Sequence, residues 1–244
     1  MKKLASCLNK IKLGSVMLSF ISVPAYALSP VQGWYAGIIL GASYMPTINL
    51  QLPADTKATL ASKGINTAHV SGSLTHNVLG NIGGQVGYRC DNMLLEVEGI
   101  YNNNPLNVLK IGSYKIESPS TSSTLRLNGE TAIGAGFVNG YYDFFSPDGS
   151  SNIVPYLGIG AGYAYVRSQI EFYYNNVLIS QELSNSNSSV VGQGIIGVSY
   201  FLDDFTAMSL DLRYFTSAKT APELNTRMQY YSVNAIFNGA FDFG

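Results

Sequence analysis

The stretch VPYLGIGAGYAYV, Val154 to Val166, alternates between two kinds of side chain. Large apolar residues such as Leu157, Ile159 and Tyr163 occupy one parity, and the other parity carries Gly158, Gly160 and Gly162. Successive side chains of a β-strand point to opposite faces, so strict alternation predicts a strand. Glycine weakens a strand, and its repeated use on one face therefore indicates that this face meets a crowded space.

Similar alternation recurs along the chain, and no low-complexity linker interrupts it. We predict a single domain over residues 28–244, built from eight strands, with the boundaries Gly33–Tyr44, Leu79–Cys90, Met93–Asn102, Thr124–Phe144, Ile153–Phe172, Val190–Leu202, Phe205–Phe215 and Met228–Phe243.

The connections between these segments alternate in length. Short turns are expected at Asp91–Asn92, Ser146–Asn152 and Asp203–Asp204, whereas long polar loops are expected at Met45–Val78, Asn103–Ser123, Tyr173–Ser189 and Thr216–Arg227. Within the first loop, the capping signals of Pro53–Gly64 predict a short surface helix. An even number of strands with short turns at one end and long loops at the other is typical of an outer-membrane barrel, in which the short turns face the periplasm.

The pattern alone fits two opposite arrangements. A soluble, lipocalin-like barrel would bury the apolar face, whereas a membrane barrel would turn that face toward lipid. A water-facing sheet normally carries lysine, yet the lysines beyond the leader all fall in predicted loops, at Lys57, Lys63, Lys110, Lys115 and Lys219. We therefore predict an all-β, eight-stranded antiparallel transmembrane up-and-down barrel, with an aromatic girdle that includes Trp34, Tyr44, Tyr88, Tyr101, Tyr163 and Tyr165.

An eight-stranded barrel is just wide enough for its own side chains to fill it. Gly158, Gly160 and Gly162 are thus expected to line the lumen and relieve crowding there. Charges on the inward face must pair, because an unpaired buried charge costs several kcal/mol. We predict a lumen charge network of Arg89, Glu96, Glu98, Glu130, Asp211 and Arg213. Such a network can either gate a narrow ion pathway or plug the barrel, and we favour the plug.

The N-terminus has the three parts of a secretory signal. Four lysines precede the apolar run Leu13–Val23, and Ala25–Ala27 forms a small-x-small cleavage site, which predicts a signal peptide over residues 1–27. The remaining chain carries ten Lys and Arg against 15 Asp and Glu, so it lacks the basic stripe that binding to nucleic acid requires. It also keeps a single cysteine, Cys90, and no internal disulfide is expected.

Candidate catalytic and ligand-binding motifs are weak. His69 and His76 lie in the first predicted loop without a third metal ligand or a serine partner, and we expect both to be solvated. GIGAG (158–162) lacks the last glycine of a dinucleotide fingerprint, because Tyr163 follows. Glu96 and Glu98 sit on a lumen face with no substrate cleft. We predict no catalytic residue, metal site or cofactor, and therefore no enzyme.

The segments GWYAGIILGASY and VPYLGIGAGYAYV, with a C-terminal strand of alternating aromatics, resemble the eight-stranded outer-membrane barrels of bacteria. More narrowly, they resemble the surface-antigen and opacity-type group, whose barrel is similar to that of outer membrane protein A. The resemblance implies a place among outer-membrane lipids and lipopolysaccharide. It also implies delivery by periplasmic chaperones to the barrel-assembly machinery, which would recognise Phe241 and Phe243, although Gly244 departs from a terminal Phe.

We therefore expect an outer-membrane surface protein with a structural or surface-interaction role, as an antigen or adhesin. Loops on a rigid scaffold commonly carry binding, so host surface molecules are the expected partners of the long loops. A small pore or transporter is the alternative function, and a lipid-modifying enzyme is a third.

Overall fold

The computed structural model describes residues 31–50, 72–111, 114–117, 125–146, 151–174, 177–178, 183–218 and 227–241. The predicted signal peptide and the predicted helix at Pro53–Gly64 lie outside these residues. The described strands are β1 (Gly33–Tyr44), β2 (Ile48–Leu50), β3 (Gly72–His76), β4 (Leu79–Cys90), β5 (Met93–Ile111), β6 (Tyr114–Glu117), β7 (Leu125–Asp143), β8 (Ile153–Tyr174), β9 (Val177–Leu178), β10 (Leu183–Phe201), β11 (Thr206–Ser217) and β12 (Gln229–Phe241). In the described part of the chain, no helix is long and apolar enough to cross a membrane.

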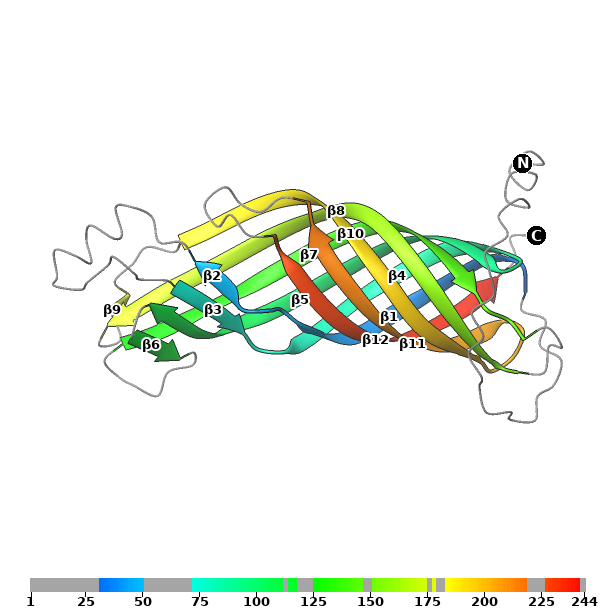
Figure 1. Cartoon of the computed structure of the whole chain (residues 1–244), viewed down its shortest axis with the longest axis horizontal. Coiled ribbons are helices and arrows are strands. Elements are labelled where there is room, and N and C mark those ends of the chain that lie inside the picture. Colours follow the sequence, from blue (N-terminus) through cyan, green and yellow to red (C-terminus); the bar gives the residue numbers. More distant parts are fainter. Residues whose placement is uncertain are drawn as a thin grey trace.

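Eight of these strands close into a barrel (Figure 1). Around the circumference the order is β5, β4, β1, β12, β11, β10, β8 and β7, and β7 pairs back with β5. Every pairing in this ring is antiparallel, including the one between the first and last strands, where Trp34 lies opposite Phe241. The prediction of an eight-stranded antiparallel barrel is confirmed.

Two predicted strands are too short at the end with the long loops. β5 continues to Ile111 rather than Asn102, and β10 begins at Leu183 rather than Val190, so parts of two predicted loops are strand. Asn-rich and Ser-rich sequence resembles a loop, but a strand beyond the membrane has no need of an apolar face. By contrast, β1 and β4 have the predicted bounds.

The extended strands build a second layer of structure at one end of the barrel, with β2, β3, β6 and β9 beside them (Figure 1). β3 and β6 both pair with the outer half of β5, β2 pairs with β3, and β9 pairs with β8. Lys110 of β5 lies opposite Lys115 of β6, so the prediction that all lysines lie in loops is wrong for these two. Both lie outside the lipid-facing band, where a strand is exposed to water.

The outer face of the barrel is apolar. Ile159 and Val97 expose 76% and 63% of their surface, whereas Glu96 and Glu98 each expose 2%. Aromatic side chains are exposed at both ends of this band, and the six predicted girdle residues expose between 45% and 59% of their surface. Trp34 packs edge-to-face on Tyr88, with ring centroids 5.5 Å apart. The apolar face therefore points outward, as the transmembrane arrangement predicts.

Tight turns connect the barrel strands at the end that we assign to the periplasm. Asp91 adopts a left-handed conformation (φ 52) in the turn between β4 and β5, and the adjoining Cys90 is an exposed free thiol. In the turn between β10 and β11, Asp203 accepts hydrogen bonds from the backbone N–H groups of Phe205 and Thr206. These hydrogen bonds, led by the one from Phe205, lower the pKa of Asp203.

An arginine on the outer face should test the membrane orientation. Leu210 and Leu202 expose 55% and 51% of their surface, but Leu210 lies in the middle of β11 and Leu202 lies at the periplasmic turn. We expect Leu210→Arg to lower the free energy of unfolding by about 2–4 kcal/mol and Leu202→Arg by about 0–1 kcal/mol, because the cost of arginine depends on depth in the bilayer. Urea unfolding in lipid vesicles measures both, and equal losses would contradict the assigned depth.

Candidate functional site in the barrel lumen

The glycines of β8 lie on the inward face, where each one accommodates a side chain or backbone group of β7. In the strand register, Gly158 lies opposite Tyr141 and Gly160 opposite Asn139. A Cβ atom at Gly158 would overlap the Tyr141 ring, and one at Gly160 would overlap the Asn139 amide. At Gly162 it would overlap the backbone carbonyl of Gly136. The bare face thus makes room for the polar β7 side chains that reach into the lumen.

Arg213 is the central cation of the lumen. Its Nη1 lies 2.5 Å from Glu98 Oε2, and its Nη2 lies 2.9 Å from Asp211 Oδ2. The Arg213 Nε donates to the same Asp211 carboxylate. The three side chains come from β5 and β11 and expose at most 2% of their surface. Pairing of this kind offsets the cost of burying charge.

Glu96 adds a third carboxylate beside this pair. It accepts hydrogen bonds from the hydroxyls of Tyr35 (2.9 Å) and Tyr141 (2.8 Å), and from Asn139 Nδ2 (3.0 Å). Asn139 Nδ2 also lies 2.8 Å from Glu98 Oε2, which links the two acidic residues. We call Glu96, Glu98, Asp211 and Arg213 the charge layer.

Arg89 belongs to a different part of the lumen, at its periplasmic end. Its guanidinium lies 2.6 Å from Asp143 and stacks near the rings of Phe145 and Phe201, at 5.8 and 5.2 Å from their centroids. Asp143 was not predicted as a lumen charge. It has the parity of Asn139 and Tyr141 on the same strand, so the alternation itself could have identified it.

The prediction that Glu130 faces the lumen is wrong. Its side chain is exposed and accepts a hydrogen bond from Asn103 Nδ2 at 3.0 Å. The inward residues of β7 are the odd-numbered ones, such as Ile133 and Phe137, so Glu130 has the outward parity. It lies beyond the aromatic girdle, where an outward carboxylate meets water.

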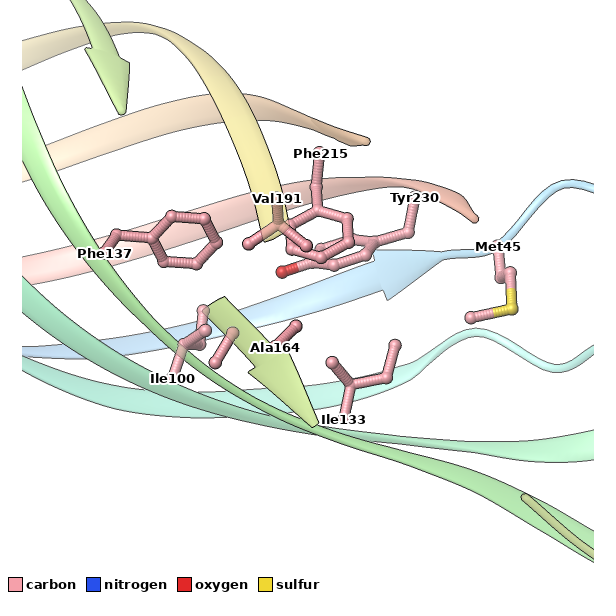
Figure 2. Close-up of a cluster of buried hydrophobic side chains, with 9 residues drawn as sticks. Met45, Ile100, Ile133, Phe137, Ala164, Val191, Phe215 and Tyr230 are labelled. Atoms are coloured by element: carbon pink, nitrogen blue, oxygen red, sulfur yellow. The ribbon is translucent and has the colours of Figure 1, made fainter. Parts of the chain in front are cut away.

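Apolar clusters lie on both sides of the charge layer. Toward the extracellular end, Phe215 stacks on Tyr230 with centroids 4.4 Å apart, and Phe137 contacts Phe215 edge-to-face (Figure 2). Toward the periplasm, Val154 and Phe201 belong to a second cluster. A pocket of about 30 Å3 beside Tyr35 and Arg89 has room for water but not for a solute. The described lumen is therefore closed by side chains above and below its charges.

His76 is not solvated, contrary to the prediction. It lies at the end of β3, exposes 6% of its surface, and its Nε2 lies 3.3 Å from Thr131 Oγ1. Burial lowers the pKa of His76 to about 4. The alternation signal missed β3 because the strand has only five residues. His69 lies outside the described residues, and among those described no three His, Cys, Asp or Glu converge as a metal site.

Acid should loosen β3, which lies beyond the girdle and outside the membrane-spanning segments. The folded-state pKa of His76 is below the unfolded value of 6.5, so its stabilising effect is complete above pH 6.5 and is lost as the pH falls toward 4. We expect amide exchange in Gly72–His76 to become faster over this range, and His76→Gln to remove the dependence. Hydrogen exchange followed by mass spectrometry measures both, and exchange that stays constant from pH 7 to 4 would contradict the prediction.

Residues 44–220 match the family model described as "Surface antigen". The chain belongs to the surface-antigen family. A protein of Gluconacetobacter diazotrophicus described as "Outer membrane protein" is 29% identical over 137 residues, which cover 54% of this chain and 33% of that protein. The chain thus spans about a third of the length of this relative.

Solved structures show the same fold. OprG of Pseudomonas aeruginosa, an outer membrane protein, superposes with a TM-score of 0.52 at 13% identity, covering 87% of this chain and 97% of OprG. Neisserial surface protein A gives a TM-score of 0.49 at 16% identity, covering 86% of this chain and 97% of that structure. With the family match, these findings identify a surface β-barrel of the bacterial outer membrane, which has a structural or surface-interaction role.

Proposed function

We propose that the barrel is a closed scaffold that holds an extracellular platform for contacts with molecules outside the cell. The supporting observation is the unequal length of the strands. β5, β7, β8 and β10 have 19 to 22 residues, whereas a transmembrane strand needs about 9–11. At roughly 3.3 Å per residue, the surplus carries the platform on the order of 20 Å beyond the membrane.

The contacts are expected to involve the segments between the platform strands, with host surface molecules as the partner class. Deleting residues 51–71 keeps β2 and β3 in the chain while removing the segment between them. We expect this variant to lose binding of bacteria to host cells and to retain the altered gel mobility of a folded barrel before boiling. Unchanged binding by a folded variant would count against this segment.

We also propose that the lumen charge network is a plug rather than a gate. The apolar clusters on both sides of the charge layer support this proposal. Steady, reproducible conductance steps in planar bilayers would favour the pore alternative instead.

The proposal includes a signal peptide over residues 1–27, delivery by periplasmic chaperones, and insertion by the barrel-assembly machinery with Phe241 and Phe243 as its C-terminal signal. Of these two aromatics, Phe241 ends β12, and Phe243 lies outside the described residues. Lipid and lipopolysaccharide are the expected surroundings of the outer face. We further propose that the protein is not an enzyme, and a changed lipid A mass spectrum in a deletion strain would contradict this.

A further inference from the structure

We propose that the charge layer binds one monovalent cation, held between Gln85 of β4 and Glu98 of β5. Three observations support this inference: the balance of charge in the lumen, the buried oxygen atoms that lack a donor, and the chemistry of those oxygens.

The charge layer contains more negative than positive groups. Glu96, Glu98 and Asp211 share the single guanidinium of Arg213, and all four side chains are buried. Arg89 does not reduce this excess, because Asp143 pairs with it. Even with a proton on Glu96, one negative charge remains. A buried net charge is costly in a space of low dielectric constant, so a counter-charge beside these carboxylates would stabilise the barrel.

Two buried oxygens in this layer have no hydrogen-bond donor. They are Gln85 Oε1 and Glu98 Oε1, on residues that expose 6% and 2% of their surface. The two residues lie directly opposite each other in the register of β4 and β5, and both point inward. The Gln85 Nε2 donates to Asn238 Oδ1 at 2.9 Å, which fixes the amide and leaves its oxygen in the lumen.

Unpaired donors do not balance these acceptors. The charged nitrogen Arg213 Nη2 lacks a hydrogen bond of good geometry, but it lies 2.9 Å from Asp211 Oδ2 and is already ion-paired. Buried acceptors without donors are uncommon in native structures, and each one calls for a bound water or ion. The negative excess in the same layer favours an ion.

The chemistry of the two oxygens points to a hard monovalent cation. One is a carboxylate oxygen and the other an amide oxygen, which are ligands for hard cations rather than for soft metals. A divalent ion such as Ca2+ usually draws on several carboxylates, and no three acidic side chains converge among the described residues. One positive charge also matches the excess that remains when Glu96 is protonated.

Sodium is the probe for the test. The protein is purified from outer membranes in detergent, and urea unfolding is followed in sodium chloride and in N-methylglucamine chloride at equal ionic strength. Selective binding to the folded barrel should lower the unfolding equilibrium constant about 100-fold when sodium exceeds its dissociation constant 100-fold. Equal curves in the two salts would overturn the proposal and assign the oxygens to water.

Two matched variants locate the effect. Gln85→Met removes one proposed ligand and should abolish the difference between the salts. Gln193→Met removes another buried lumen glutamine, whose Nε2 donates to Asn139, and should retain the difference even if the barrel becomes less stable. A difference that persists in Gln85→Met would overturn the assigned site. A barrel stabilised by lower pH and unaffected by sodium would show that protons, rather than a metal cation, neutralise the layer.

Discussion

Gly162→Ala should produce a chain that fails to reach the folded, heat-modifiable form or that unfolds at much lower urea. The added Cβ would overlap the Gly136 carbonyl, which belongs to the neighbouring strand and takes part in the sheet. β7 and β8 would have to separate locally, and overpacking of this kind costs about 1–3 kcal/mol. The measurement is the fraction of unboiled protein with folded mobility, together with the urea midpoint.

Gly194→Ala is the matched control, because the same methyl group would meet no atom within 4 Å on the outward face of the adjacent strand β10. We expect its free energy of unfolding to stay within about 0.5 kcal/mol of the parent. If both alanine variants behaved alike, the inward crowding would not be the reason for glycine on β8.

Arg213→Met should have a comparable or larger effect. Removing the guanidinium leaves Glu98 and Asp211 buried without their cation, and breaking a buried pair in this way costs about 3–5 kcal/mol. The variant should unfold at lower urea in lipid vesicles, and adding Asp211→Asn should restore part of the loss because it removes one of the stranded charges.

Arg167→Met provides the control for a lost arginine, since Arg167 is exposed on β8. Its free energy of unfolding should change by about 0.5 kcal/mol or less. An equal loss in both arginine variants would indicate that net charge, rather than the buried contacts of Arg213, determines the stability.

The sequence predicted the barrel well because two constraints act on every membrane-spanning residue. One face must be apolar for lipid and the other must fit a narrow lumen, so the alternation in Gly33–Tyr44 and Leu79–Cys90 marks the strand bounds. Beyond the membrane neither constraint applies. The outer parts of β5 and β10 therefore looked like loops, and the short strand β3 gave no signal although it buries His76.

The candidate site was only partly predictable. Parity placed Arg213, Glu98 and Asp211 on one face, but it does not say which charges meet across the lumen. That depends on how far the strands are staggered, and the stagger separates Arg89 from the charge layer and brings it to Asp143. The assignment of Glu130 failed for a simpler reason, because its parity is that of the lipid-facing residues.

Trp34 is the chain's sole tryptophan, and it stands at the periplasmic end of the barrel beside Tyr88. Indole emission from this protein therefore comes from one depth in the bilayer. Brominated acyl chains that quench it at successive positions can time the arrival of the turn-bearing end during insertion, with no label attached to the chain.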